Sequence, residues 1–195
     1  PTADTRARYP FEFALWVNYR LNGRRLGFQY VIENAGRGVM PFSLGAPPAF
    51  SLAWGQADRI EDYRLEFEKQ ETASPRLLGP DHLLSSSTVD VMEKGRVLPL
   101  RADLFDRDAL LFLGLKSQKV SLCSSKHPNR LTVEFSGFPD LGVWAKPGAP
   151  FVCIEPWYGH ADPQGADGVI LNKAGIIRLP AAGTFSCEHA IVVEE

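Results

Sequence analysis

Residues 150–162, PFVCIEPWYGHAD, decide how the rest of the chain is interpreted. The first half of this stretch, residues 151–154, is apolar and β-prone, which predicts a strand buried on both faces. Glu155 then interrupts the apolar run. Because side chains alternate along a strand, Glu155 is expected on the same face as Phe151 and Cys153. A carboxylate at the end of such a strand is costly to bury unless it has a use.

The residues after Glu155 indicate what this carboxylate is for. Pro156 favours an extended backbone at Glu155 and stiffens its position. Trp157 and Tyr158 add large flat rings, and Gly159 lets the chain turn. A rigid acid beside aromatic rings suits a sugar site, because the acid handles hydroxyl protons and the rings cover apolar sugar faces. The alternative is an acid that only forms a salt bridge at a strand end.

Composition limits the class of protein. A chain of 195 residues with 45% hydrophobic and 23% charged residues predicts one globular domain, residues 1–195. The net charge of −2 gives no sign of a nucleic-acid or anionic-membrane partner, and the apolar runs are too short to span a bilayer. The first ten residues carry no apolar segment of a signal peptide. Cys123, Cys153 and Cys187 are too widely spaced for a metal quartet or a redox pair, so they predict reduced thiols in a cytoplasmic protein.

Short β-prone segments separated by Gly- and Pro-containing turns run along the whole chain. The expected strands are residues 11–19, 25–33, 40–44, 64–68, 97–100, 120–123, 131–135, 142–145, 151–154, 169–173, 175–179, 183–188 and 190–194. Asn22-Gly23 predicts a hairpin turn, residues 56–62 and 74–84 read as loops, and residues 104–113 as a turn feeding an apolar segment. The longest expected helix is one short turn around residues 103–108. This pattern predicts an all-β sandwich that is mostly antiparallel.

Several stretches resemble the aldose 1-epimerase (galactose mutarotase-like) family, and most closely its LacX-type branch. The most specific is CIEPWYG, residues 153–159. The others are residues 9–11, 41–50, 104–105, 108–110, 138–139, 141–144 and 173–176, together with Gly183 and Phe185. The resemblance runs from about Tyr9 to the C-terminus.

This resemblance implies a fold, a reaction and a catalytic base. The fold is a galactose mutarotase-like β-supersandwich with a sugar cleft on one concave sheet. Members interconvert the α and β anomers of an aldose. A base takes the proton of the anomeric hydroxyl while an acid protonates the ring oxygen, and neither a metal nor an organic cofactor is needed. Glu155 matches the base of the family, and burial is expected to raise its pKa.

The chain departs from the family pattern in two ways. Pro47 stands where the family has the histidine of a GHPAF-type motif that serves as the acid. Family members are also longer at the N-terminus, so the chain resembles the C-terminal two-thirds of the family fold and is expected to be N-terminally incomplete. Such a fold exposes sheet edges and apolar faces, which makes a homo-oligomer possible.

Five further residues are candidates for sugar binding, and each has a simpler reading. Asp108 matches a sugar-binding aspartate of the family approximately, or it is a cap or turn residue. Trp144 and Trp157 either contact the sugar or belong to the core. Lys146 either hydrogen-bonds a hydroxyl or phosphate, or is a solvated loop lysine. His160 either supplies the missing acid or a sugar contact, or is a surface histidine.

The remaining three histidines, His82, His127 and His189, lack a partner pattern and are expected at the surface. Three functions remain open from the sequence. The first is an aldose 1-epimerase-like enzyme acting on a hexose. The second is a sugar-binding protein of the same fold that Pro47 has impaired in catalysis, and the third is a sandwich used only for interaction.

Overall fold

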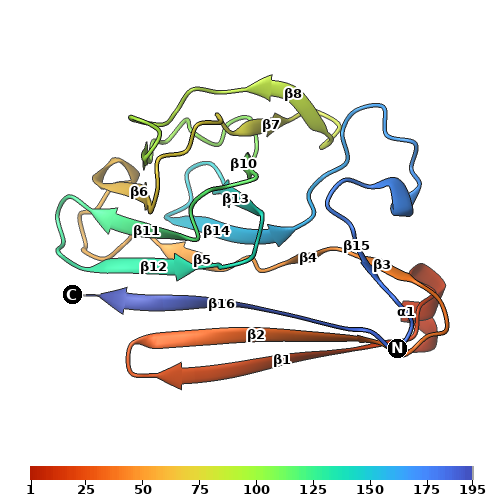
Figure 1. Ribbon diagram of the computed structural model, residues 1–195. Coiled ribbons are helices and arrows are strands. Elements are labelled where there is room, and N and C mark those ends of the chain that lie inside the picture. Colours follow the sequence, from red (N-terminus) through yellow and green to blue (C-terminus); the bar gives the residue numbers. More distant parts are fainter. Residues whose placement is uncertain (195) are drawn as a thin grey trace.

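The computed structural model describes residues 1–194, and nearly all of its regular structure is β-strand (Figure 1). The strands form two large antiparallel sheets with a small two-stranded sheet beside them. One apolar cluster draws residues from both large sheets, so the two sheets form a sandwich. The predicted all-β, mostly antiparallel sandwich is confirmed.

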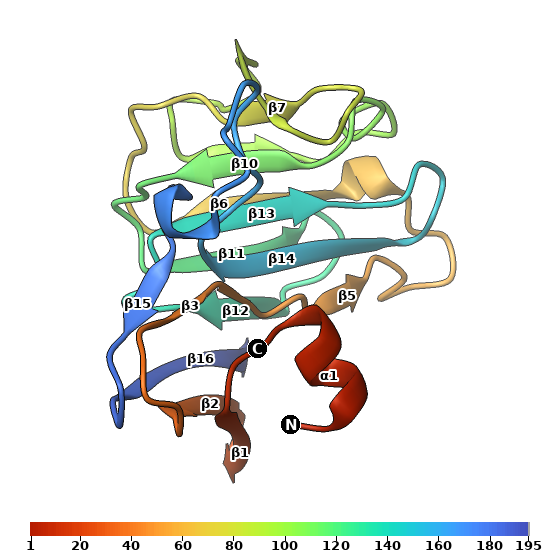
Figure 2. The ribbon, with the colours of Figure 1, turned by 90° about the vertical axis from the view of Figure 1, so that its right-hand side faces the viewer.

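The first large sheet has the strand order β1-β2-β16-β12-β11-β6-β9. In that order its strands are Phe13–Asn22, Arg25–Asn34, Thr184–Glu194, Arg130–Glu134, Lys119–Ser124, Tyr63–Phe67 and Val97–Pro99. The second has the order β4-β14-β13-β10-β7-β8, and β5 also pairs with β14. Its strands are Leu44–Gly45, Phe151–Tyr158, Asp140–Trp144, Leu110–Leu113, Arg76–Leu78, Leu84–Thr88 and, for β5, Ala49–Ser51. Figure 2 shows β14, β13, β10 and β7 following one another across this sheet.

The smaller elements lie outside the two large sheets. Strand β15, Ile177–Leu179, pairs with β3, Met40–Phe42. The helix α1, Ala3–Arg8, and the 3₁₀ turns Ile60–Asp62 and Ile170–Asn172 complete the regular structure.

Side-chain alternation explains the core. On β6, Tyr63, Leu65 and Phe67 are buried, as expected for the last two. They share one apolar cluster with Val152 and Ile154 of β14 in the facing sheet. Each large sheet therefore has an inner face in the core and an outer face, and the outer face of the second sheet is the one that carries Glu155.

The hairpin predicted at the start of the chain is confirmed, with its turn shifted by one position. Asn22 pairs with Arg25, so the two turn residues are Gly23 and Arg24. Gly23 adopts a φ of +56°, which glycine tolerates best. Strand β1 lies at the sheet edge and leaves large apolar side chains exposed, including Tyr19. Such a surface favours association, and the homo-oligomer stays a prediction.

The expectations for residues 74–84 and 183–194 are wrong. The expected loop at 74–84 contains β7, which has only three residues and is too short to show a period. Residues 183–188 and 190–194 were expected as two strands but belong to one, β16. The polar pair Glu188 and His189 interrupts the apolar pattern in sequence. In the strand they point to opposite faces, where Glu188 bonds Arg25 on the exposed side.

Helical segments also differ from expectation. Residues 169–173 contain the 3₁₀ turn Ile170–Asn172 where a strand was expected. Residues 103–108 form consecutive turns without a helix, ending at Asp108 with a φ of +73°. Helix α1 was not anticipated; its capping box joins Thr2 and Thr5.

Two histidines expected at the surface lie elsewhere. His189 is only 3% exposed and stacks on Phe28 with 4.6 Å between ring centroids. His127 is half-buried and hydrogen-bonds Asp58 at 2.9 Å. In both cases a partner from a distant part of the chain draws the ring inward, which the local sequence does not reveal. His82 is exposed, as expected.

The three cysteines are buried free thiols, in agreement with the expectation of reduced cysteines. The cytoplasmic location inferred from them stays a prediction. Among the helices of the described residues, none is long and apolar enough to cross a membrane.

Candidate functional site

Strand β14 places Glu155 on the outer face of the second sheet. Val152 and Ile154 point into the core and are fully buried. Cys153 and Trp157 therefore share the outer face with Glu155, because alternate residues of a strand point the same way. Glu155 itself is half-buried.

The surroundings of Glu155 favour its protonated form. Burial raises the pKa of the Glu155 carboxyl, and hydrogen bonds from Trp157 and Cys153 lower it by less, so the net pKa is raised. The neighbouring carboxylate and, above all, burial raise the pKa of the Cys153 thiol to about 11. The thiol therefore stays protonated at neutral pH, and Glu155 is the carboxyl group of this strand whose pKa is raised.

Two glycines hold the indole of Trp157 against the sheet. A Cβ at Gly142 of β13 would lie 2.5 Å from Cζ2 of Trp157, and a Cβ at Gly45 of β4 would lie 3.0 Å from its Cδ1. A side chain at Gly142 would thus displace the ring. The bare backbone lets the indole lie close to the sheet and reach the carboxylate of Glu155.

The register of β13 against β14 places Glu155 between two other features of the outer face. Gly142 lies directly opposite Glu155, and Asp140 lies opposite Trp157 in the neighbouring row. Trp144 occupies the row on the other side. Groups at the Asp140 end and at the Trp144 end therefore flank Glu155.

His160 and Asp140 form a buried pair at the first end. Nδ1 of His160 lies 2.9 Å from Oδ2 of Asp140, and the two side chains are 12% and 7% exposed. The other carboxylate oxygen of Asp140 accepts from the backbone N–H of Gly114 at 3.0 Å. Gly159, with a φ of +86°, makes the turn that brings His160 back over the sheet. His160 is not the surface histidine of the simpler reading.

A cavity of about 780 Å³ lies at the other end, and it brings together two of the sequence candidates, Asp108 and Trp144. Asp108 precedes β10 and is hydrogen-bonded to His82 from the β7–β8 turn, with 3.1 Å between Oδ2 and Nδ1. Trp144 contributes an aromatic wall and packs edge-on against Phe151 at 6.1 Å. The volume of the cavity is in the range of small-molecule sites. The lining does not include Glu155, which lies beside Trp144 on the adjacent strand.

Two of the residues considered in the sequence analysis lie outside the cavity. Lys146 is exposed in the loop between β13 and β14 and does not line the cavity. Pro47 is exposed in the connection between β4 and β5, on the far side of β14 from the cavity. Sequence reasoning missed His82 and Asp140. The signal for Asp140 was available, because it is two residues before Gly142 on the same strand face.

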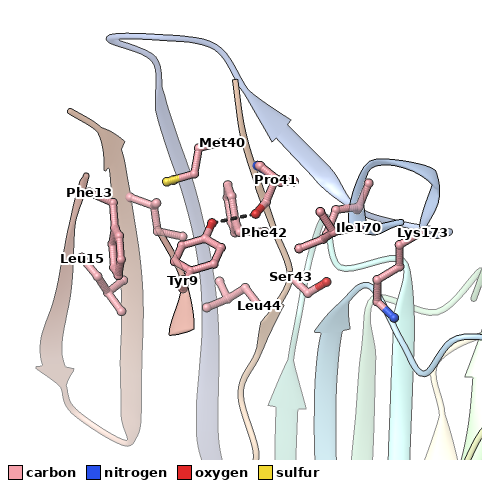
Figure 3. Close-up of a pocket in the computed structure, with 12 residues that line it drawn as sticks. Tyr9, Phe13, Leu15, Met40, Pro41, Phe42, Ser43, Leu44, Ile170 and Lys173 are labelled. Atoms are coloured by element: carbon pink, nitrogen blue, oxygen red, sulfur yellow. Dashed lines mark hydrogen bonds between the residues drawn. The ribbon is translucent and has the colours of Figure 1, made fainter. Parts of the chain in front are cut away.

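A second pocket, of about 340 Å³, has a different character. Figure 3 shows Tyr9 and Phe13 facing Met40 and Leu44 across it, with the hydroxyl of Tyr9 donating to the carbonyl of Pro41 at 2.6 Å. Within the described part of the chain, Lys173 is the only ionisable side chain in its lining apart from that phenol. Over residues 1–194, its lining contains neither a carboxylate nor an imidazole, in contrast to the surroundings of Glu155. Among the described residues no cluster of His, Cys, Asp and Glu has the form of a metal site.

Comparisons with known proteins agree with this architecture. The family profile described as Aldose 1-epimerase matches residues 1–173. The plasmid-encoded protein LacX of Lactococcus lactis is 30% identical over 99% of this chain and 66% of its own length. The chain thus spans slightly less than two-thirds of that relative, and its equivalence to the C-terminal two-thirds of the family fold stays a prediction.

Solved structures give the same result. A galactose mutarotase related enzyme from Lactobacillus acidophilus superposes with a TM-score of 0.90 at 29% identity, over 100% of this chain and 66% of its own. A galactose mutarotase-like protein from Lactobacillus casei superposes with a TM-score of 0.89 at 28% identity, over 100% of this chain and 67% of its own. The fold is therefore galactose mutarotase-like, as the sequence predicted. Since the family profile covers most of the chain, this protein belongs to the aldose 1-epimerase family.

Proposed function

We propose that this protein interconverts the α and β anomers of a hexose, with Glu155 as the general base. One observation carries the proposal. A half-buried carboxylate with a raised pKa stands on the outer face of the second sheet, between two aromatic side chains, Trp157 and Trp144. Raised carboxyl pKa values in such surroundings are typical of catalytic groups.

The reaction needs two proton transfers at one sugar ring. Glu155 takes the proton of the anomeric hydroxyl, the bond between C1 and the ring oxygen breaks, and an acid protonates the ring oxygen. Rotation about C1–C2 and closure on the other carbonyl face give the second anomer, with both protons returned. The reaction is redox-neutral and the two proton transfers account for every bond that changes, so the proposal invokes no metal or organic cofactor.

Other residues of the outer face are assigned supporting roles. Trp157 fixes the Glu155 carboxylate by its indole N–H, and Trp144 offers a flat wall to an apolar sugar face. We propose that Asp108 and His160 form hydrogen bonds with hydroxyl groups of the sugar. Lys146 remains a candidate for a hydroxyl or phosphate that extends beyond the cavity.

Polarimetry of freshly dissolved α-glucose and α-galactose tests the proposal. We expect the protein to accelerate the change in optical rotation, and Glu155→Gln to lower that rate by about 100-fold or more. Glu33→Gln, which neutralises an exposed carboxylate on β2, is the matched control and should keep the parent rate. Equal rates for the parent and Glu155→Gln would show that Glu155 is not the base.

Pro47 supports a second candidate, a sugar-binding protein without turnover. Its side chain carries no proton, and it is exposed beside β14, at the position that matches the family histidine. In this case sugars should quench the fluorescence of Trp144 or Trp157 while anomer exchange stays at the uncatalysed rate. Absence of both quenching and turnover would leave only a role in interaction.

A further inference from the structure

The cavity beside Trp144 contains a histidine that could carry the second proton. Nδ1 of His82 lies 3.1 Å from Oδ2 of Asp108, and both residues line the cavity. We propose that His82 is the general acid that protonates the ring oxygen, and that Asp108 positions it. This inference rests on the proposed function, since it assigns a group to the second half of the same reaction.

The strand register relates this pair to Glu155 through β10 and β13. Leu111 of β10 lies opposite Gly142, which in turn lies opposite Glu155. Two strand spacings therefore separate Leu111 from Glu155, about 10 Å. Asp108 precedes Leu111 by three residues, so the pair approaches the outer face from the β10 side. The cavity of about 780 Å³ has room for one sugar ring, and Trp144, which lines it, is the neighbour of Glu155 on the outer face, so a ring that passes Trp144 would contact both proton carriers.

The backbone supports a fixed geometry for the pair. His82 and Asp108 both have positive φ values, 59° and 73°, in a region that residues other than glycine seldom occupy. His82 is held in its turn by a bond from its N–H to the carbonyl of Gly79 at 2.9 Å. The Oδ1 of Asp108 accepts from the N–H of Ala109 at 2.7 Å. Unfavourable backbone conformations held in this way concentrate at functional sites.

This arrangement orients the imidazole for proton transfer. When Nδ1–H donates to Asp108, Nε2 is the nitrogen left to face a substrate. In the forward step, the imidazolium gives the proton on Nε2 to the ring oxygen as the C1–O bond breaks and Glu155 takes the hydroxyl proton. In closure the ring oxygen returns that proton to Nε2, so charge and atoms balance over the cycle.

Accessibility favours His82 over the other histidine of the outer face. The side chain of His82 is 79% exposed, whereas that of His160 is 12% exposed beside Asp140. A general acid must touch the atom it protonates. His160 is mostly covered and lies at the Asp140 end of the outer face, while His82 lines the cavity.

The test is the variant His82→Asn. Asparagine tolerates positive φ, so the turn is expected to fold, but the amide cannot exchange a proton. We expect a loss of about 100-fold or more in the anomerisation rate. Sugar affinity, measured by quenching of Trp144 fluorescence, should change little, and free imidazole added to the assay should restore part of the rate. His127→Asn removes the imidazole of another His–Asp pair, at Asp58, and should keep the parent rate.

Each result decides between defined possibilities. A His82→Asn variant as fast as an active parent overturns the role of His82 and leaves the proposed function standing. A slow variant with weakened sugar affinity and no response to imidazole also overturns it, because His82 then only binds or supports the fold. A parent that does not accelerate anomerisation removes the proposed function, and this inference with it.

Discussion

Protonation of His189 should destabilise the fold below neutral pH. The ring is 3% exposed and stacks on Phe28 with an angle of 4° between planes and on Tyr30 at 5.7 Å. Its Nδ1 is buried and has no hydrogen-bond partner within the described residues. Burial lowers the pKa of His189 from 6.5 to about 4, because a charged ring in this position would lose its hydration.

The size of the effect follows from proton linkage. The unfolded chain binds the proton near pH 6.5 and the folded chain only near pH 4, so the contribution of neutral His189 is complete above pH 6.5. It is lost as the pH falls towards 4. The full shift corresponds to about 3 kcal/mol, and the part lost between pH 7 and pH 5 is about 2 kcal/mol.

Urea denaturation at pH 7, 6 and 5, followed by circular dichroism, measures this loss. His189→Phe keeps a flat ring against Phe28 and removes the titrating group. We expect the free energy of unfolding of this variant to fall by about 2 kcal/mol less than that of the parent between pH 7 and pH 5. Asn18→Ala, at an exposed position of β1 without a titrating group, should retain the parent slope. The same pH slope in His189→Phe and in the parent would refute the assignment.

Three further predictions concern the site and the core. The raised pKa of Glu155 means that the base is lost on acidification sooner than an ordinary glutamate, so initial anomerisation rates should fall with pH at values above 4.5. A profile flat down to pH 4 would contradict this. Gly142→Ala forces Trp157 away from the sheet and should lower the anomerisation rate at least several-fold. A shift of the tryptophan emission is the structural readout. An unchanged rate and an unchanged spectrum would be inconsistent with the packing of Trp157 on Gly142. Tyr63→Phe removes a buried hydroxyl that donates to Asp58 at 2.5 Å. We expect the free energy of unfolding, measured by urea denaturation, to fall by about 1–3 kcal/mol. No measurable decrease would show that this hydrogen bond does not stabilise the fold.

The sequence predicted the part of the site that depends on a single strand. Alternation along β14 is a local property, so residues 151–157 sufficed to place Glu155 on a face with Cys153 and away from Ile154. The same holds for Leu65 and Phe67 on β6, whose alternation with charged residues is visible in RLEFE. Turn chemistry located the first hairpin to within one residue.

The parts that depend on distant pairing were not predictable. His82 and Asp108 are 26 positions apart and meet only because β7 and β10 are neighbours in the sheet. His189 looked like an exposed residue because the apolar rings that cover it belong to β2, at the other end of the chain. Its environment is set by the pairing of β16 with β2, and no local pattern encodes that contact.

Pro47, which the sequence resemblance matches to a histidine of the family, bears on the proposed orientation of the sugar. Pro47 lies on the β4 side of β14, while His82 and Asp108 lie on the β10 side. With Glu155 fixed at the anomeric hydroxyl, an acid at His82 requires the ring oxygen to point towards β10. The carbon next to the ring oxygen then directs its substituent, C6 in a hexose, into the cavity lined by Trp144. Under the proposed roles of Glu155 and His82, an acid on the β10 side of β14 instead of the β4 side therefore changes the orientation of the sugar and keeps the number of proton carriers at two.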